Sequence, residues 1–201
     1  MQEIVPGVRH WTAHRDTIGQ EVGSAWIVPA GVLVDPLLPE EGLDAFRDAD
    51  EPPRAIVLTT GLHRRDAPRI ADALGIGILA PVEARERIGR ELEFTPYGDG
   101  DEVAPGVRAV RIGALCPDEY ALRADLAGGT VLLADALIEQ EQGLDVPPEG
   151  LLGDDPDEVR RGLRAGLARL LEAPFRHLLP SHGTPVVDRG ADALREAMAR
   201  G

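Results

Sequence analysis

The sequence predicts an α/β fold in which two β-sheets pack against each other with helices on the outside. The chain has two β-rich blocks, each followed by helices, and this order is typical of layered sheet-and-helix domains. Hydrophobic residues make up 43% of the 201 residues, which is enough for a large core. No Pro/Gly/Ser-rich linker divides the chain, so we expect a single domain over residues 1–201.

The first block is predicted from short apolar and β-branched runs that are separated by polar turns. Strands are expected at residues 7–12, 22–29, 31–34, 54–59 and 77–80, and helices at 40–48, 65–74 and 81–88. Leu43 and Phe46 lie three residues apart, on one face of the first helix. Gly75 is placed to cap the second helix, and Pro81 to begin the third.

The second block repeats this order of strands and then helices. Strands are expected at residues 91–95, 107–112, 119–124, 130–133 and 176–179, and helices at 155–171 and 191–199. The start of the long helix is the best marked, with Asp155 as N-cap, Pro156 at the first position and Glu158 at the third.

Composition excludes several classes of partner and location. The net charge of −14 and the pI near 4.7 argue against nucleic acid and anionic membranes as partners. The single cysteine, Cys116, rules out an internal disulfide and fits a reducing compartment. The N-terminus does not resemble a signal peptide, and no apolar run approaches the ~18 residues of a membrane span. We therefore expect a soluble, cytoplasmic protein.

The most informative segment is IVLTTGLHRRDA, residues 56–67. An apolar strand ends there in a flexible turn, and a polar cluster that includes His63 and Asp66 opens the next helix. A strand end that leads into histidine and aspartate is a natural position for a metal ion, although two arginines accompany the donors here.

This segment resembles the metal-binding loop of the metallo-β-lactamase-fold hydrolases, His-x-His-x-Asp-His. Aligned on Asp66, the family histidines fall on Leu62, Arg64 and Ala67. Three later segments resemble family motifs, in the order that the family has them. Residues 113–120 have Leu115 at a histidine position, and residues 130–137 have Asp135 at a metal-bridging position. Residues 179–183 (LPSHG) keep the motif histidine as His182. The resemblance implies a four-layer αββα sandwich, metallo-β-lactamase-like.

The same resemblance implies that most of the metal ligands are lost. Asp66, Asp135 and His182 keep a donor atom, whereas Leu62, Ala67 and Leu115 offer none. Arg64 would repel a metal ion, by about 8 kcal/mol for a dication 4 Å away at an effective dielectric of ~20. We expect no binuclear centre.

Two hypotheses follow for function. The first is a pseudoenzyme that binds no cofactor and keeps a pocket for an unidentified small molecule or protein; its pocket residues are His63, Arg64, Asp66, Leu115, Cys116, Asp135 and His182. The second is a divergent hydrolase with one zinc or other divalent ion on Asp66, Asp135 and His182.

The loop residues carry two further expectations. In an extended loop His63 points away from the site, bonded to backbone or a carboxylate, and it becomes a fourth ligand only if the backbone shifts by one residue. Arg64 is expected to replace the charge of the metal through a contact with Asp66 or Asp135. Cys116 is expected to be a buried, inert thiol.

Overall fold

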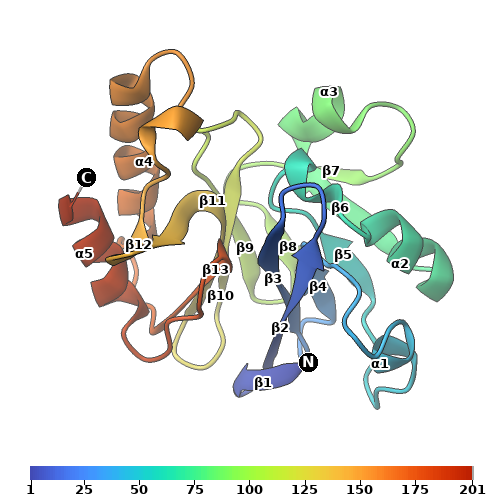
Figure 1. Ribbon diagram of the computed structural model, residues 1–201. Helices are drawn as coiled ribbons and strands as arrows, with labels where there is room; N and C mark the ends of the chain where they lie inside the picture. The colour runs from blue at the N-terminus through green and yellow to red at the C-terminus, as the bar shows by residue number, and fades with distance from the viewer. Residues whose placement is uncertain (201) are drawn as a thin grey trace.

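The computed structural model describes residues 1–200; Gly201, the last residue of the predicted domain, lies outside the described residues. Two sheets face each other, one group of helices covers the outer face of each sheet, and the layers therefore follow the order αββα, as predicted (Figure 1).

The first sheet has seven strands in chain order. They are β1 (Gln2–Val5), β2 (Val8–Arg15), β3 (Gln20–Ile27), β4 (Val32–Val34), β5 (Ala55–Val57), β6 (Gly77–Pro81) and β7 (Thr95–Tyr97). Strands β1 to β4 are antiparallel, and β4 to β7 are parallel. The carboxyl ends of β4 and β5 therefore lie side by side, and the loops that follow them meet at one edge.

The second sheet has six strands, and five of them run in the order β12-β11-β10-β9-β8. Their bounds are β8 (Glu102–Ala104), β9 (Val107–Arg111), β10 (Tyr120–Ala124), β11 (Thr130–Gln140) and β12 (Gly143–Asp145). The sixth strand, β13 (His177–His182), pairs in parallel with β11. Strands β11 and β13 therefore end near each other.

The helices lie on the two outer faces. They are α1 (Asp44–Arg47), α2 (Ala67–Leu74) and α3 (Arg85–Ile88) on the first sheet, and α4 (Pro156–Leu170) and α5 (Gly190–Arg200) on the second. Short 3-10 helices form η1 (Gly61–Arg64), η2 (Val82–Ala84) and η3 (Glu149–Leu151). One apolar cluster fills the space between the sheets, and one lies under each helical layer. Burial of apolar surface on both faces of both sheets holds the four layers together.

Two predicted helix boundaries are confirmed, whereas Pro81, predicted to begin a helix, is the last residue of β6, and α3 begins at Arg85. Asp155 accepts a hydrogen bond from the Glu158 amide (3.0 Å) at the start of α4, and Gly75 ends α2 with φ of 66°. The prediction is wrong in the middle of the chain, where residues 91–95 are mostly turn and the strand begins at Thr95. There a parallel partner, β6, determines which residues form the strand.

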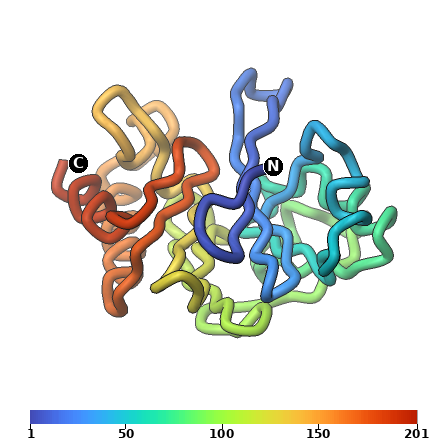
Figure 2. Tube along the Cα trace, turned by 90° about the horizontal axis from the view of Figure 1, so that it is seen from below, coloured from blue at the N-terminus to red at the C-terminus, as the bar shows by residue number. Residues whose placement is uncertain are grey.

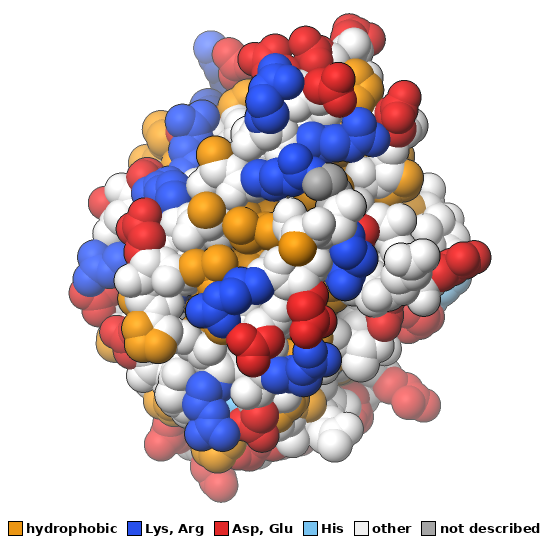
Figure 3. Space-filling model, turned by 90° about the vertical axis from the view of Figure 1, so that its left-hand side faces the viewer, with side chains coloured by type: hydrophobic (Ala, Val, Ile, Leu, Met, Phe, Trp, Pro, Cys, Tyr) orange, Lys and Arg blue, Asp and Glu red, His pale blue; other side chains and the backbone are white. Residues whose placement is uncertain are grey.

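The β2–β3 hairpin stands out from the body of the molecule, between its N-terminal and C-terminal parts (Figure 2). On the face that carries α4 and α5, arginine and acidic side chains alternate around apolar ones, so neither charge dominates it (Figure 3). Ion pairs of the Arg160–Asp157 and Arg195–Asp192 type contribute to this pattern. None of the helices within residues 1–200 has the length and apolar character needed to cross a membrane.

Candidate metal centre

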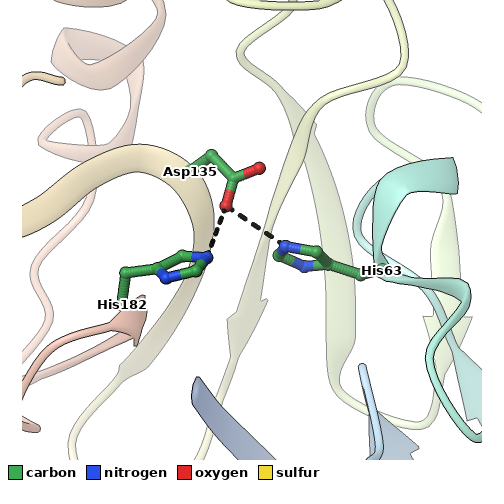
Figure 4. Close-up of side chains that lie close together, drawn as sticks. All are labelled: His63, Asp135 and His182. Carbon is green, nitrogen blue, oxygen red and sulfur yellow. Dashed lines mark hydrogen bonds and ion pairs between the residues drawn. The ribbon is translucent and has the colours of Figure 1, made fainter. Parts of the chain in front are cut away.

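Three side chains from distant parts of the chain meet where the two sheets approach each other. Asp135 Oδ1 lies 3.1 Å from His63 Nε2 and 3.2 Å from His182 Nε2 (Figure 4). One donor atom from each residue lies within 4.8 Å of the others. His63 is buried, and the other two are partly exposed, so the group faces solvent on one side.

Strands β11 and β13 position Asp135 and His182. Leu133 lies opposite Pro180 and Ile138 opposite His182, so β11 spans more residues than β13 over the same stretch. The extra residues form a bulge that contains Asp135. Bulges often turn a side chain toward a functional site, and this one brings the carboxylate onto the last residue of β13.

The turn after β5 positions His63. Thr60 is the N-cap of η1: its hydroxyl accepts a hydrogen bond from the Leu62 amide (3.3 Å), and its carbonyl accepts one from the His63 amide (3.1 Å). Asp118 accepts hydrogen bonds from the Gly61 amide (2.8 Å) and the Thr60 hydroxyl (3.1 Å). Because these contacts tighten the turn, the loop is not extended and His63 points into the site.

Asp35, the residue after β4, holds His63 from behind. Its carboxylate lies 2.9 Å from His63 Nδ1 and accepts hydrogen bonds from the Thr59 amide (2.8 Å) and hydroxyl (2.5 Å). Asp35 is 2% exposed. With Nδ1 bonded to a buried carboxylate, Nε2 is the nitrogen left for Asp135 or a metal ion. In the sequence, Asp35 stands at the end of an apolar strand, in VLVDP (residues 32–36). This position was a signal for a site residue, but the sequence analysis did not predict Asp35 as one.

The two carboxylates also control the protonation of His63. Burial and the charge of Arg65 act against a proton on the ring, but Asp35 and Asp135 outweigh both and raise the pKa of His63 to about 9. Burial likewise opposes charge on Asp135, yet His63 and His182 hold the pKa of Asp135 well below its usual range. Without an ion, His63 is therefore an imidazolium between two carboxylates at neutral pH.

Glu119 supports Asp135 from beneath. Its Oε1 accepts a hydrogen bond from the Asp135 amide (3.0 Å), whereas Oε2 is buried and has no hydrogen-bond partner among residues 1–200. Burial, and then the charge of Asp135, raise the pKa of Glu119 to about 8. A mostly protonated Glu119 adds little negative charge to the centre.

Arg65, rather than the predicted Arg64, brings a positive charge into the site. Arg65 Nη1 donates hydrogen bonds to the carbonyls of Gly23 (2.6 Å) and Asp35 (2.7 Å). Within the described chain, the Arg64 side chain makes neither of the predicted contacts with Asp66 and Asp135 and no other hydrogen bond or ion pair. The tight turn of η1 accounts for the difference, because it advances the inward-facing positions by one residue.

Asp66 also differs from its predicted role. Its Oδ2 accepts a hydrogen bond from the Leu38 amide (2.8 Å), and it precedes α2 as the N-cap residue. The donor group thus has His63 in the place given to Asp66 by the sequence analysis. The sequence analysis allowed His63 only as a fourth donor beside Asp66, whereas in the structure His63 belongs to the donor group and Asp66 does not.

A cleft of about 1290 Å³ opens over the donor group. His63, Asp135 and His182 line it together with Leu115, Cys116 and Arg65, whereas Arg64 and Asp66 do not. Apolar residues contribute much of the remaining surface: Ile18, Val22, Leu62, Ile138 and Leu151. Burial raises the pKa of the Cys116 thiol to about 12, so Cys116 adds an uncharged, unreactive group.

The donor group fits a single divalent ion. Two imidazoles and one carboxylate are ligands that zinc, iron and manganese accept. An ion with bonds of about 2.0–2.2 Å in a tetrahedral site has neighbouring ligand atoms about 3.3–3.5 Å apart. The two histidine–aspartate distances of 3.1 and 3.2 Å lie close to this range, and all three donor atoms lie within 4.8 Å of one another. The Asp35–His63 contact supplies the outer hydrogen bond that metal-binding histidines usually make.

No protein-family model and no curated protein sequence matches the chain. Solved structures do match it over nearly its whole length. A metallo-β-lactamase from Erythrobacter litoralis is 16% identical with a TM-score of 0.71, over 100% of this chain and 96% of that one. The metallo-β-lactamase family protein TTHA1429 from Thermus thermophilus is 17% identical with a TM-score of 0.68, over 98% and 80%. TTHA1623 in a di-iron-bound form is 22% identical with a TM-score of 0.65, over 88% and 94%.

The chain therefore has the metallo-β-lactamase fold, and its low identity to these structures marks it as divergent. Shifted by one residue, the motif His-x-His-x-Asp-His falls on Gly61, His63, Arg65 and Asp66. One motif histidine is then kept as His63, and the motif aspartate is replaced by Arg65.

Proposed function

We propose that this protein is a hydrolase that uses one divalent metal ion, held by His63, Asp135 and His182. One observation carries the proposal: the three donor atoms converge in an open cleft, and a buried carboxylate already orients one of the imidazoles. TTHA1623, a protein of the same fold, is known in a di-iron-bound form, which is consistent with metal binding by this fold.

A divalent ion at such a site would polarise the bond to be cleaved and lower the pKa of a bound water. The residues of this chain supply the rest. Asp35 keeps His63 in the orientation that presents Nε2, and Glu119 fixes the peptide of Asp135. Since His63 holds a proton in the absence of the ion, binding of the ion displaces that proton.

The cleft indicates a small molecule as substrate. Its volume of about 1290 Å³ exceeds the roughly 300–1,000 Å³ of most small-molecule sites, so it has room for a bulky small molecule, and many of its lining side chains are apolar. Arg15 and Arg87 add positive charge to the lining. We propose an ester, thioester, lactone or phosphodiester with an apolar body. Nucleic acid and membranes are not proposed as partners because the chain carries a net charge of −14.

The metal content of the purified protein tests the proposal. Protein made without a metal-affinity tag should hold about one zinc, iron or manganese ion per chain by elemental analysis. Removal of the ion with a chelator should abolish hydrolysis of thioester, lactone or phosphodiester probes, and the ion should restore it.

Asp135→Ala is expected to lose the ion, while Asp125→Ala makes the same change on an exposed residue and should keep it. A folded wild-type protein that takes up no ion from micromolar zinc, iron or manganese would overturn the proposal.

A metal-free binding protein is the second candidate, and one specific observation favours it. The carboxylates of Asp35 and Asp135 both contact the His63 ring and interact electrostatically with the Arg65 guanidinium, which donates its hydrogen bonds to backbone carbonyls. On this hypothesis the cleft binds an unidentified small molecule or protein without chemistry, and the metal-uptake experiment separates the two candidates directly.

A further inference from the structure

The Arg65 guanidinium is held in place by the backbone of the surrounding fold. Its Nη1 binds the carbonyl of Gly23 in β3 and the carbonyl of Asp35 after β4. Gly23 and Asp35 are both buried, and they lie near the centre of the first sheet. A guanidinium with two backbone acceptors cannot swing into solvent without losing both hydrogen bonds.

The conformation of Arg65 is costly, which indicates a role beyond its hydrogen bonds. Its φ is +41°, a region that side chains other than glycine rarely adopt. Its Nε is buried without a hydrogen-bond partner among residues 1–200. Strain of this kind persists where the surrounding structure enforces it, and it gathers at functional sites.

The position of the charge shows what that role is. Arg65 lines the same cleft as the three donor residues, and it interacts electrostatically with the carboxylates of Asp35 and Asp135. If one dication binds to His63, Asp135 and His182, the negative charges of Asp35 and Asp135 offset the charge of the ion. The charge of Arg65 then leaves only a small positive excess. A second dication in the cleft would meet the fixed positive charge of Arg65.

We propose that the Arg65 guanidinium takes the place of one divalent cation and so limits how many ions the centre can hold. The inference rests on the donor group of the proposed function, but it concerns the capacity of the centre and is tested separately. Replacing Arg65 by an acid should raise that capacity by one ion per chain.

The test measures ions bound per chain, by elemental analysis after equilibration with zinc or manganese and by calorimetric titration of the metal-free protein. Arg65→Asp removes the cation and adds a donor. Arg64→Asp makes the identical change one residue earlier, on a side chain outside the cleft lining, and is the matched control. We expect one ion in wild type, two in Arg65→Asp and one in Arg64→Asp.

Other outcomes separate this inference from the proposed function. A change from none in wild type to one in Arg65→Asp would support the role of Arg65 while overturning the single-ion hydrolase. The same number in wild type and Arg65→Asp, or two ions in wild type, would overturn the role of Arg65.

A second variant, Arg65→Asn, keeps the inference testable if Arg65→Asp does not fold, since asparagine tolerates positive φ better than most residues. Loss of the positive charge without a new donor should tighten binding of the first ion by about tenfold or more. Unchanged or weaker binding by a folded Arg65→Asn would count against the inference.

Discussion

The two halves of the centre differ in what holds their side chains. Asp135 and His182 lie on paired strands of the second sheet, where the ladder between β11 and β13 fixes them. His63 and Arg65 lie on a tight turn after β5, where a step of one residue exchanges the side chains that face the cleft. The sequence analysis placed Asp135 and His182, which lie on strands, in the site. On the turn, the charged and donor side chains in the site are His63 and Arg65, each one residue away from a position predicted to face it.

This difference shows which half of the donor group depends on distant contacts. A strand residue keeps its direction as long as the ladder is intact, because side chains alternate between faces. The turn depends on contacts from elsewhere, chiefly Asp118 to Thr60 and Gly61. The cation and this histidine therefore lie on the half whose geometry is set by tertiary contacts.

The largest expected effect is loss of either histidine. His63→Ala and His182→Ala should each weaken zinc binding by at least about 100-fold, since each removes one of only three protein ligands. Competition titration against a chromophoric chelator measures this, with the exposed His14→Ala as control. If His182→Ala weakened zinc binding and His63→Ala did not, His63 would not be a ligand of the centre.

A smaller effect is expected from Asp35→Asn, which alters the residue behind His63. Loss of the outer carboxylate should weaken metal binding by about 10- to 100-fold. Asp99→Asn is the control: it also changes a carboxylate that accepts an amide hydrogen bond, but Asp99 lies outside the cleft lining and does not contact His63. Urea unfolding shows whether both variants lose similar stability, and an equal loss of metal affinity in both would assign Asp35 a purely structural role.

The smallest effect on the centre is expected from Asp66→Ala. Zinc affinity should stay within about twofold of wild type, because Asp66 binds the Leu38 amide and not the ion. The free energy of unfolding of the metal-free protein should fall by about 1–2 kcal/mol, the cost of leaving a partly buried amide unpaired. A large loss of affinity would restore the alignment that places Asp66 on the metal.

The fold was predictable because local chemistry and order along the chain determine it. Asp155 and Gly75 mark helix ends through contacts within a few residues, and both predictions are confirmed. The strand at Thr95–Tyr97 was not predictable to the residue, because pairing with β6 selects it. Long-range pairing of this kind leaves little trace in a single sequence.

The site was only partly predictable, for a related reason. Asp135 and His182 were placed through the resemblance of residues 130–137 and 179–183 to family motifs. His63, Arg65 and Asp35 depend instead on the shape of one turn. That shape is set by Asp118, which lies more than 50 residues further along the chain. Two of these residues, Asp35 and Arg65, also have positive φ, a conformation that nothing in their side chains predicts.

The distance along the chain between the ligands has a consequence for biosynthesis. His63 and His182 are separated by roughly 120 residues, and the β11 bulge with Asp135 lies between them. At about 5–20 residues per second, a ribosome needs several seconds or more to travel from the first ligand to the last. Until then the nascent chain lacks one of the three residues of the donor group. The centre is therefore expected to load after both sheets have docked, from the metal pool that surrounds the folded protein.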